Sequence, residues 1–157
     1  MLTSLSIKNF ALIEKLDIDF SENFSIITGE TGAGKSILLG ALGLVLGKRA
    51  DLSSLKNKEE KCVIEAQFDI ARYNLESFFE ANDLDFEKET IIRREILSSG
   101  KSRAFVNDSP VNLQELQELG EYLIDIHSQH QTQELSEENF QFDIIDSMAG
   151  NTSEIAA

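Results

Sequence analysis

Tryptophan is absent from this sequence, and proline and cysteine each occur only once in 157 residues. The lone Cys62 excludes a disulfide within the chain and fits a reducing compartment. The sequence has no long uncharged apolar run, and no positively charged leader followed by an apolar segment. We therefore expect a soluble, cytoplasmic protein without a membrane partner, of a length that suits one domain.

Basic side chains are unevenly distributed along a chain whose formal net charge is -14. Residues 1–50 carry five Lys or Arg and five Asp or Glu, residues 51–110 carry nine and thirteen, and residues 111–157 carry none and ten. This C-terminal acidity argues against a DNA-facing surface in the last third of the chain. Exposed charges are screened beyond about 8 Å at physiological salt, so the acidity need not oppose an anionic ligand bound elsewhere.

Residues 29–36 read Gly-Glu-Thr-Gly-Ala-Gly-Lys-Ser, a complete G-x-x-x-x-G-K-[ST] phosphate-binding loop. Its glycines let backbone N–H groups approach a polyphosphate without side chains in the way. Lys35 would reach the outer phosphates, and Ser36 would offer its hydroxyl to Mg²⁺. Ser36 would also open a helix, whose N-terminus carries about half a positive charge. The octet predicts binding of the phosphates of a nucleotide.

The apolar pattern around this loop predicts the first elements. Alternation at residues 2–7 and 12–20 predicts two half-buried antiparallel strands. The apolar residues 24–27 predict a strand that leads into the loop. A helix is expected at 36–46, ending at Gly47, and it should be buried because it is apolar on all sides.

The rest of the chain predicts a mixture of strands and helices. After α-helical residues 36–46, we expect a polar loop at 48–60, a strand at 62–70 and a short helix near 75–81. A hairpin of strands at 90–96 and 103–107 and a turn at 107–110 should follow. The last expected elements are a helix capped by Asn112 and Glu115 that ends near Leu119 before Gly120, a buried strand at 122–126, a polar loop at 127–134 and a helix at 137–148.

Five segments, in order and spacing, resemble the N-terminal end of the RecN family of bacterial DNA repair proteins, in the SMC-like branch of ABC-type ATPases. They are residues 7–14, 28–38, 46–51, 100–107 and 123–130. The resemblance implies an α/β P-loop NTPase fold, with an antiparallel β layer beside the P-loop core. It also implies that residues 1–150 form the N-terminal lobe of an ATPase head and that residues 151–157 lead toward a coiled coil.

In this family both ends of one long polypeptide build the head. The C-terminal lobe carries the signature motif, the Walker B acidic pair and the switch histidine, and none of these motifs occurs in this sequence. The resemblance therefore implies a fragment that binds ATP and Mg²⁺ weakly and hydrolyses ATP negligibly alone. Its implied partners are the C-terminal lobe, a second head in a homodimer, and DNA through the full-length assembly in the bacterial cytoplasm.

The resemblance also implies roles for individual residues. The nucleotide would be held by Gly29, Glu30, Thr31, Gly32, Ala33, Gly34, Lys35, Ser36 and Ile37, with Lys35 also catalytic. Gln129 matches the Q-loop glutamine that reaches the metal and the attacking water, with Gln131 and Gln133 as rivals. Arg49 would approach a phosphate, and Lys8 and Asn9 would approach the base.

Other reactive residues allow more than one interpretation. His127 and His130 lack further ligands for a metal site and would support the Q-loop or line the nucleotide pocket. Cys62, within an apolar strand, is expected in the core. The basic cluster, defined as Arg93, Arg94, Lys101 and Arg103, would either meet DNA phosphates or pair with Glu87, Glu89 and Glu95, and ion pairing is favoured.

Two other functions compete with the ATPase head. A self-contained P-loop kinase acting on a small molecule would fit the length, although no arginine-bearing lid is recognisable. A non-catalytic module that only senses nucleotide is the other alternative. A half-head should gain nucleotide affinity from a second lobe, whereas a kinase needs no partner.

Overall fold

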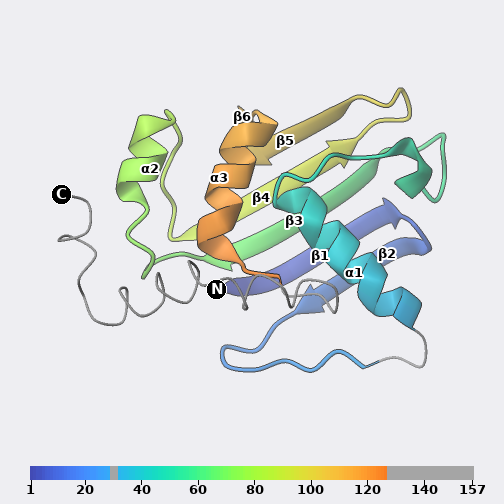
Figure 1. Ribbon diagram of the computed structural model, residues 1–157, viewed down its shortest axis with the longest axis horizontal. Helices are drawn as coiled ribbons and strands as arrows, with labels where there is room; N and C mark the ends of the chain where they lie inside the picture. The colour runs from blue at the N-terminus through green and yellow to red at the C-terminus, as the bar shows by residue number, and fades with distance from the viewer. Residues whose placement is uncertain (29–31, 127–157) are drawn as a thin grey trace, which may run out of the picture. The chain divides into compact units, whose positions relative to one another are not determined.

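The computed structural model describes residues 1–28 and 32–126. Six strands in these residues form one antiparallel sheet in the order β2-β1-β3-β4-β5-β6 (Figure 1). They are β1 (Leu2–Phe10), β2 (Ile13–Asp19), β3 (Cys62–Asp69), β4 (Glu89–Ile96), β5 (Ser102–Val106) and β6 (Ser109–Val111). The antiparallel opening pair, the strand near 62–70 and the later hairpin are confirmed. The sheet belongs to a compact unit, Met1–Ile124.

One face of the sheet forms the hydrophobic core. In β3 the alternate residues Cys62, Ile64, Ala66 and Phe68 are all fully buried, as expected of a strand covered on one side. The helices α1 (Gly32–Val45) and α3 (Leu113–Leu123) cross this face (Figure 1) and contribute residues to the same core. The opposite face, called the outer face below, carries mainly polar and charged residues. The short α2 (Glu76–Ala81) confirms the helix expected near 75–81.

The helix α1 begins earlier than the sequence predicts. Its first residues, from Gly32 to Ser36, are themselves part of the phosphate-binding motif. At the other end, the amide of Gly47 donates to the carbonyl of Leu44, and the amide of Lys48 donates to the carbonyl of Gly43. With Gly47 at φ +87, this is a Schellman motif, so the helix stops where the sequence predicts.

Two expectations around α1 are wrong. Residues 24–27 form no strand in the described structure, and the Phe24 and Ile26 side chains are 79% and 73% exposed. An extended segment becomes a strand only when a neighbouring strand satisfies its backbone, and none pairs with it within residues 1–28 and 32–126. The helix is not buried on all sides either, since Leu39 is 40% exposed while Ala41 and Val45 are fully buried.

The helix α3 starts as expected and ends later. The Asn112 side chain accepts from the amides of Gln114 and Glu115, and the Glu115 carboxylate accepts from the amide of Asn112, which completes the capping box. The helix then continues through Gly120 to Leu123, so the end near Leu119 and the strand at 122–126 are wrong. Glycine in a helix costs about 1 kcal/mol relative to alanine, and here Gly120 is buried closely against Leu46, the residue after α1.

The last strand forms through a two-residue turn. Asn107 and Asp108 both have positive φ, 48 and 65, as in the type I′ turns that join antiparallel strands. The turn expected at 107–110 is therefore confirmed, but it extends the sheet by β6, which the sequence did not predict. The strand β6 has three residues, one of them Pro110. The loop expected at 127–134 and the helix expected at 137–148 lie outside the described residues.

Candidate functional site

The N-terminal end of α1 is the candidate phosphate site. Gly34, Lys35 and Ser36 lie in its first turns and are exposed. A Cβ added to Gly34 would meet no atom within 4 Å, so the backbone here is open to an approaching ligand. Ile37, the last residue of the predicted set, is half-buried against the core. Gly29, Glu30 and Thr31 lie outside the described residues, and Gly32 and Ala33 are placed as the start of the helix.

The electrostatics of this helix end favour an anion. No acidic residue lies in the first turn of α1, and unpaired N–H groups there carry a partial positive charge. Lys35 forms no ion pair within the described part of the chain. A helix N-terminus with an exposed lysine fits the phosphates of a nucleotide chemically.

Asn9, predicted to approach the base, has a structural task as well. Its backbone has φ 55, and the residue is 4% exposed at the end of β1. The side-chain Nδ2 donates to the carbonyls of Asn57 and Glu60 at 2.8 and 2.9 Å, while Oδ1 accepts from the Asn57 amide at 2.6 Å. The amide therefore tethers the loop 57–60, and its role at a base stays a prediction. Its neighbour Lys8 is exposed on the outer face.

Arg49 lies in the loop after α1, just beyond the Schellman motif, and its side chain is exposed. The Asp51 carboxylate accepts from the Ser53 amide at 2.9 Å, and this hydrogen bond lowers the pKa of Asp51. The next element is the 3₁₀ helix η1 (Leu52–Ser54). The loop is thus ordered directly after Arg49, and the role of Arg49 at a phosphate stays a prediction.

The turn between β1 and β2 meets both α1 and this loop. The Phe10 ring lies beside Gly40 of α1, where an added Cβ would be 3.5 Å from the ring. Phe10 also bridges to Leu55, and the Ala11 amide donates to the Ser54 carbonyl at 2.6 Å. The structure therefore brings together α1, the turn that follows Asn9 and the loop that follows Arg49. Gln129, Gln131, Gln133, His127 and His130 lie outside the described residues.

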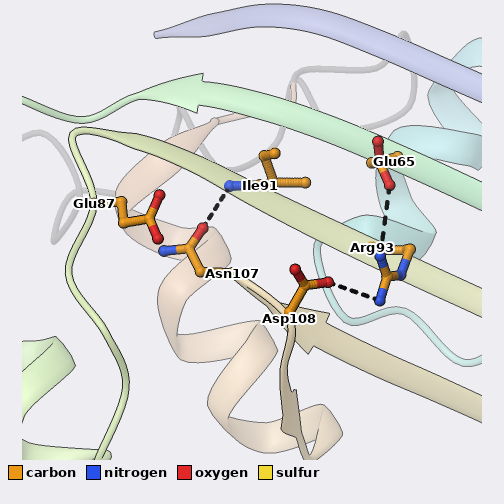
Figure 2. Close-up of a pocket in the computed structure, with 6 residues that line it drawn as sticks. All are labelled: Glu65, Glu87, Ile91, Arg93, Asn107 and Asp108. Carbon is orange, nitrogen blue, oxygen red and sulfur yellow. Dashed lines mark hydrogen bonds and ion pairs between the residues drawn. The ribbon is translucent and has the colours of Figure 1, made fainter.

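The basic cluster is divided between the two faces of the sheet. On the outer face, Arg93 contacts Asp108 at 3.0 Å, Glu95 at 3.9 Å and Glu65 at 4.0 Å, and its guanidinium lies 4.7 Å from the centre of the Phe105 ring. Arg93, Asp108 and Glu65 line a hollow of about 270 Å³ together with Glu87, Ile91 and Asn107 (Figure 2). The predicted ion pairing is confirmed for Arg93 and Glu95, while Asp108 and Glu65 are partners that the sequence analysis missed.

Arg94 points into the core face, a position that the sequence analysis also missed. It is 1% exposed, its guanidinium Nη2 donates to the Ser102 hydroxyl at 3.3 Å, and its buried Nε has no hydrogen-bond partner among the described residues. Burial lowers the pKa of Arg94. The alternation of β4 carried this signal, because Arg94 shares the period of the buried Ile92 and Ile96.

The described residues hold neither a metal-binding cluster nor a membrane-spanning helix. Residues 1–28 and 32–126 contain no group of three His, Cys, Asp or Glu side chains that could hold a metal ion. In the same part of the chain, no helix has both the length and the apolar character needed to span a membrane. Cys62 is buried in the core as expected, and burial raises the pKa of its thiol to about 11.

The sheet, the helix that starts in the phosphate-binding motif and the loop after it follow the order of a known domain. A family model described as "AAA domain" matches residues 4–153. The chain belongs to the AAA domain family. The AAA domain model thus includes the phosphate-binding motif, nearly all of the sheet and α3.

Curated relatives of this AAA domain chain confirm the predicted resemblance to RecN. The chain is 44% identical to the DNA repair protein RecN of Vibrio cholerae over 158 residues, which cover 100% of this chain and 28% of that protein. It is 39% identical to the DNA repair protein RecN of Bacillus subtilis, across 99% of this chain and 27% of that protein. The chain thus spans less than a third of the length of these relatives.

Solved structures confirm the predicted fold class of this AAA domain chain. A chain from a study of ATP-driven dimerization and DNA-stimulated activation of SMC ATPases matches with a TM-score of 0.64 at 20% identity, covering 94% of this chain and 98% of that one. The SMC head domain from Thermotoga maritima matches with a TM-score of 0.56 at 22% identity, covering 75% of this chain and 41% of that one. At these identities the likeness establishes the fold, an ATPase-head fold of the P-loop class.

Proposed function

We propose that this chain is the ATP-binding part of the ATPase head of a RecN-like protein that acts in DNA double-strand break repair and recombination. The observation that carries the proposal is the exposed N-terminal end of α1, which presents Lys35 and Ser36 within a complete phosphate-binding motif. The RecN relatives, whose names state DNA repair, support the process.

In this proposal Gly29 to Ser36 bind the phosphates of ATP, and Ile37 helps to hold the helix start. Lys35 neutralises the outer phosphates as a point charge, and the Ser36 hydroxyl offers one oxygen to Mg²⁺. Arg49 approaches a phosphate from the ordered loop after α1, and Asn9 places the β1–β2 turn near the base. Mg²⁺, when bound, supplies charge neutralisation at the phosphates.

A second lobe is the proposed partner, and exposed apolar side chains near the phosphate site support it. Phe24, Ile26, Ile27 and Leu39 are 79%, 73%, 45% and 40% exposed. Three of them belong to the segment before the phosphate motif, which forms no strand within the described residues. A strand supplied by the C-terminal lobe would satisfy the backbone of this segment and cover its side chains.

In this proposal, ATP hydrolysis requires the completed head. Gln129 is proposed to reach the metal and the attacking water, while the C-terminal lobe and the second head of a homodimer supply the acidic pair and the signature motif. Residues 1–150 would then form the N-terminal lobe, with 151–157 leading toward a coiled coil. The site of action is the bacterial cytoplasm.

DNA contact is proposed for the full-length assembly rather than for the basic cluster of this chain. Arg93 is paired with carboxylates and Arg94 is buried, so neither presents a free charge to a phosphate. Replacing Arg93 and Lys101 together by Gln in the full-length protein should leave DNA affinity within about twofold, because we propose that other parts of the assembly bind the DNA. A tenfold or greater loss would assign DNA binding to this hairpin.

Calorimetry tests the nucleotide site. Titration with Mg-ATP should show weak binding to the chain alone and at least tenfold tighter binding when a separately expressed C-terminal lobe is present. Lys35→Ala should abolish both signals without changing the unfolding transition, since Lys35 is exposed and unpaired in the described part of the chain. Turnover by the chain alone that is well above background and is lost in Lys35→Ala would contradict the half-head proposal.

A further inference from the structure

The residues that directly follow α1 pack closely against α3, and this contact is called the joint below. Gly47, at φ +87, lies so near α3 that an added Cβ would be 2.5 Å from the Gln117 Cγ and 2.9 Å from the Gln117 backbone nitrogen. One helical turn further along α3, an added Cβ on Gly120 would be 3.3 Å from the side chain and the carbonyl oxygen of Leu46. Real Cβ atoms rarely make contacts this short, so these two glycines permit the approach.

A hydrogen bond closes this joint. The Gln117 side-chain amide donates to the Gly47 carbonyl at 3.0 Å. This carbonyl lies two residues beyond the last residue of α1, so no N–H group of the helix can reach it. Gln117 therefore supplies from α3 a donor that α1 cannot supply itself, although the Gln117 side chain is exposed on the helix surface.

The joint lies at one end of a helix whose other end is the phosphate site. The helix α1 has 14 residues, which corresponds to about 21 Å. A helix of this length packed on a sheet moves as a rigid element, so a ligand that fixes its first turn also fixes its last turn. Local opening of α3 must break the Gln117–Gly47 bond and the Gly120–Leu46 contact.

We infer that Gln117 is a positioning residue that couples nucleotide binding at the first turn of α1 to the stability of α3, through its hydrogen bond to the Gly47 carbonyl. The inference rests on the proposed function, because it requires a nucleotide at Lys35 and Ser36. By linkage, a ligand that stabilises α1 raises the free energy needed to open α3, and a firmly held α3 raises nucleotide affinity by the same factor.

Hydrogen exchange with and without saturating Mg-ATP tests the coupling in the chain itself. Peptides from α1 report occupancy of the site, and peptides from α3 report the transmitted effect. In the unaltered chain, Mg-ATP should slow exchange in both helices, by about fivefold in α3, which is the lower range of allosteric couplings. In Gln117→Met, Mg-ATP should still slow exchange in α1 but should change exchange in α3 less than twofold.

Gln114→Met is the matched control. Gln114 is exposed on the same helix, and its side-chain amide donates to the Glu118 carboxylate rather than to α1. This variant should keep the full response of α3. A merely structural role of Gln117 would speed exchange of α3 equally with and without nucleotide, leaving the ratio of the two rates unchanged. Gln117→Lys places a different donor at this position, so it should recover part of the response of α3 that Gln117→Met loses.

The outcomes separate this inference from the function on which it rests. A response of α3 in Gln117→Met equal to that of the unaltered chain would overturn the coupling. A response of α1 without any response of α3 in the unaltered chain would also overturn it, while leaving nucleotide binding intact. No response in either helix would overturn the proposed function and this inference with it. Should Gln117→Met fail to fold, Gln117→Glu removes the donor while keeping the size of the side chain.

Discussion

The guanidinium of Arg94 donates to the hydroxyl of Ser102 across the core face of the sheet, at 3.3 Å. No carboxylate pairs with Arg94 in residues 1–28 and 32–126, and its Nε has no hydrogen-bond partner there. Removing a guanidinium from water costs several kcal/mol unless its donors are satisfied. Arg94 is therefore held in the core by the packing around its side chain rather than by an ion pair.

Arg94→Met should raise the free energy of unfolding by about 1–2 kcal/mol, because a buried charge is replaced by an apolar chain of similar length. Urea denaturation measures the change. Arg103→Met is the control, since Arg103 is an exposed arginine of the same hairpin and its replacement should change the free energy by less than about 0.5 kcal/mol. A loss above about 1 kcal/mol in Arg94→Met would show that the guanidinium stabilises the core.

Gly47→Ala should destabilise the chain by about 2 kcal/mol or more. Alanine is strained at φ +87, and its Cβ would overlap the backbone of α3. Thermal unfolding followed by circular dichroism reports the loss. Gly40→Ala is the matched control in α1, because its Cβ would make an ordinary contact with Phe10 at 3.5 Å, and alanine should stabilise the helix by about 0.5–1 kcal/mol. Equal effects at the two positions would contradict the close helix approach.

The Cys62 thiol should be unreactive in the folded chain. Its pKa of about 11 leaves on the order of one thiolate in a thousand at pH 8. Ellman's reagent should react slowly without denaturant and rapidly in urea. Since the folded pKa is raised above its ordinary value of 9.0, the unfolded thiol ionises first, and stability should fall as pH rises from about 9 to about 11. Cys62→Ala should lack this particular decline.

Phe24→Ser combined with Ile26→Ser should leave the unfolding free energy of the chain within about 0.5 kcal/mol, because both side chains are largely exposed. The same double variant should bind the C-terminal lobe at least tenfold more weakly, since apolar burial contributes about 25 cal/mol per Å². Analytical ultracentrifugation of the mixture measures the second effect. Undiminished binding would place the interface between the lobes elsewhere.

The elements that the sequence predicted well are those whose signals are local. The capping box of Asn112 and Glu115, the Schellman glycine Gly47 and the alternation of β3 each depend on a few neighbouring residues, and each is confirmed. The phosphate-binding motif likewise predicted a helix start, although α1 includes more of the motif than expected.

The elements that the sequence mispredicted depend on distant residues. Gly120 reads as a helix end, but it remains helical where it packs against Leu46, the residue that follows α1. Residues 24–27 read as a strand, but no strand pairs with them within residues 1–28 and 32–126. The resemblance placed Asn9 near a base, and that role stays a prediction; its tether to the loop 57–60 could not be predicted because it depends on residues 48 and 51 positions away.

The short strand β6 determines how the sheet can grow. With three residues, one of them Pro110, it offers few amide donors to another chain. The opposite edge is β2, which has seven residues and bears the alternating charges of Lys15, Asp17 and Asp19. Edge-to-edge polymerisation of copies of this sheet would need two receptive edges on each molecule. Within the described residues, one proline and one row of charges therefore make both edges of the sheet poor partners for a second copy.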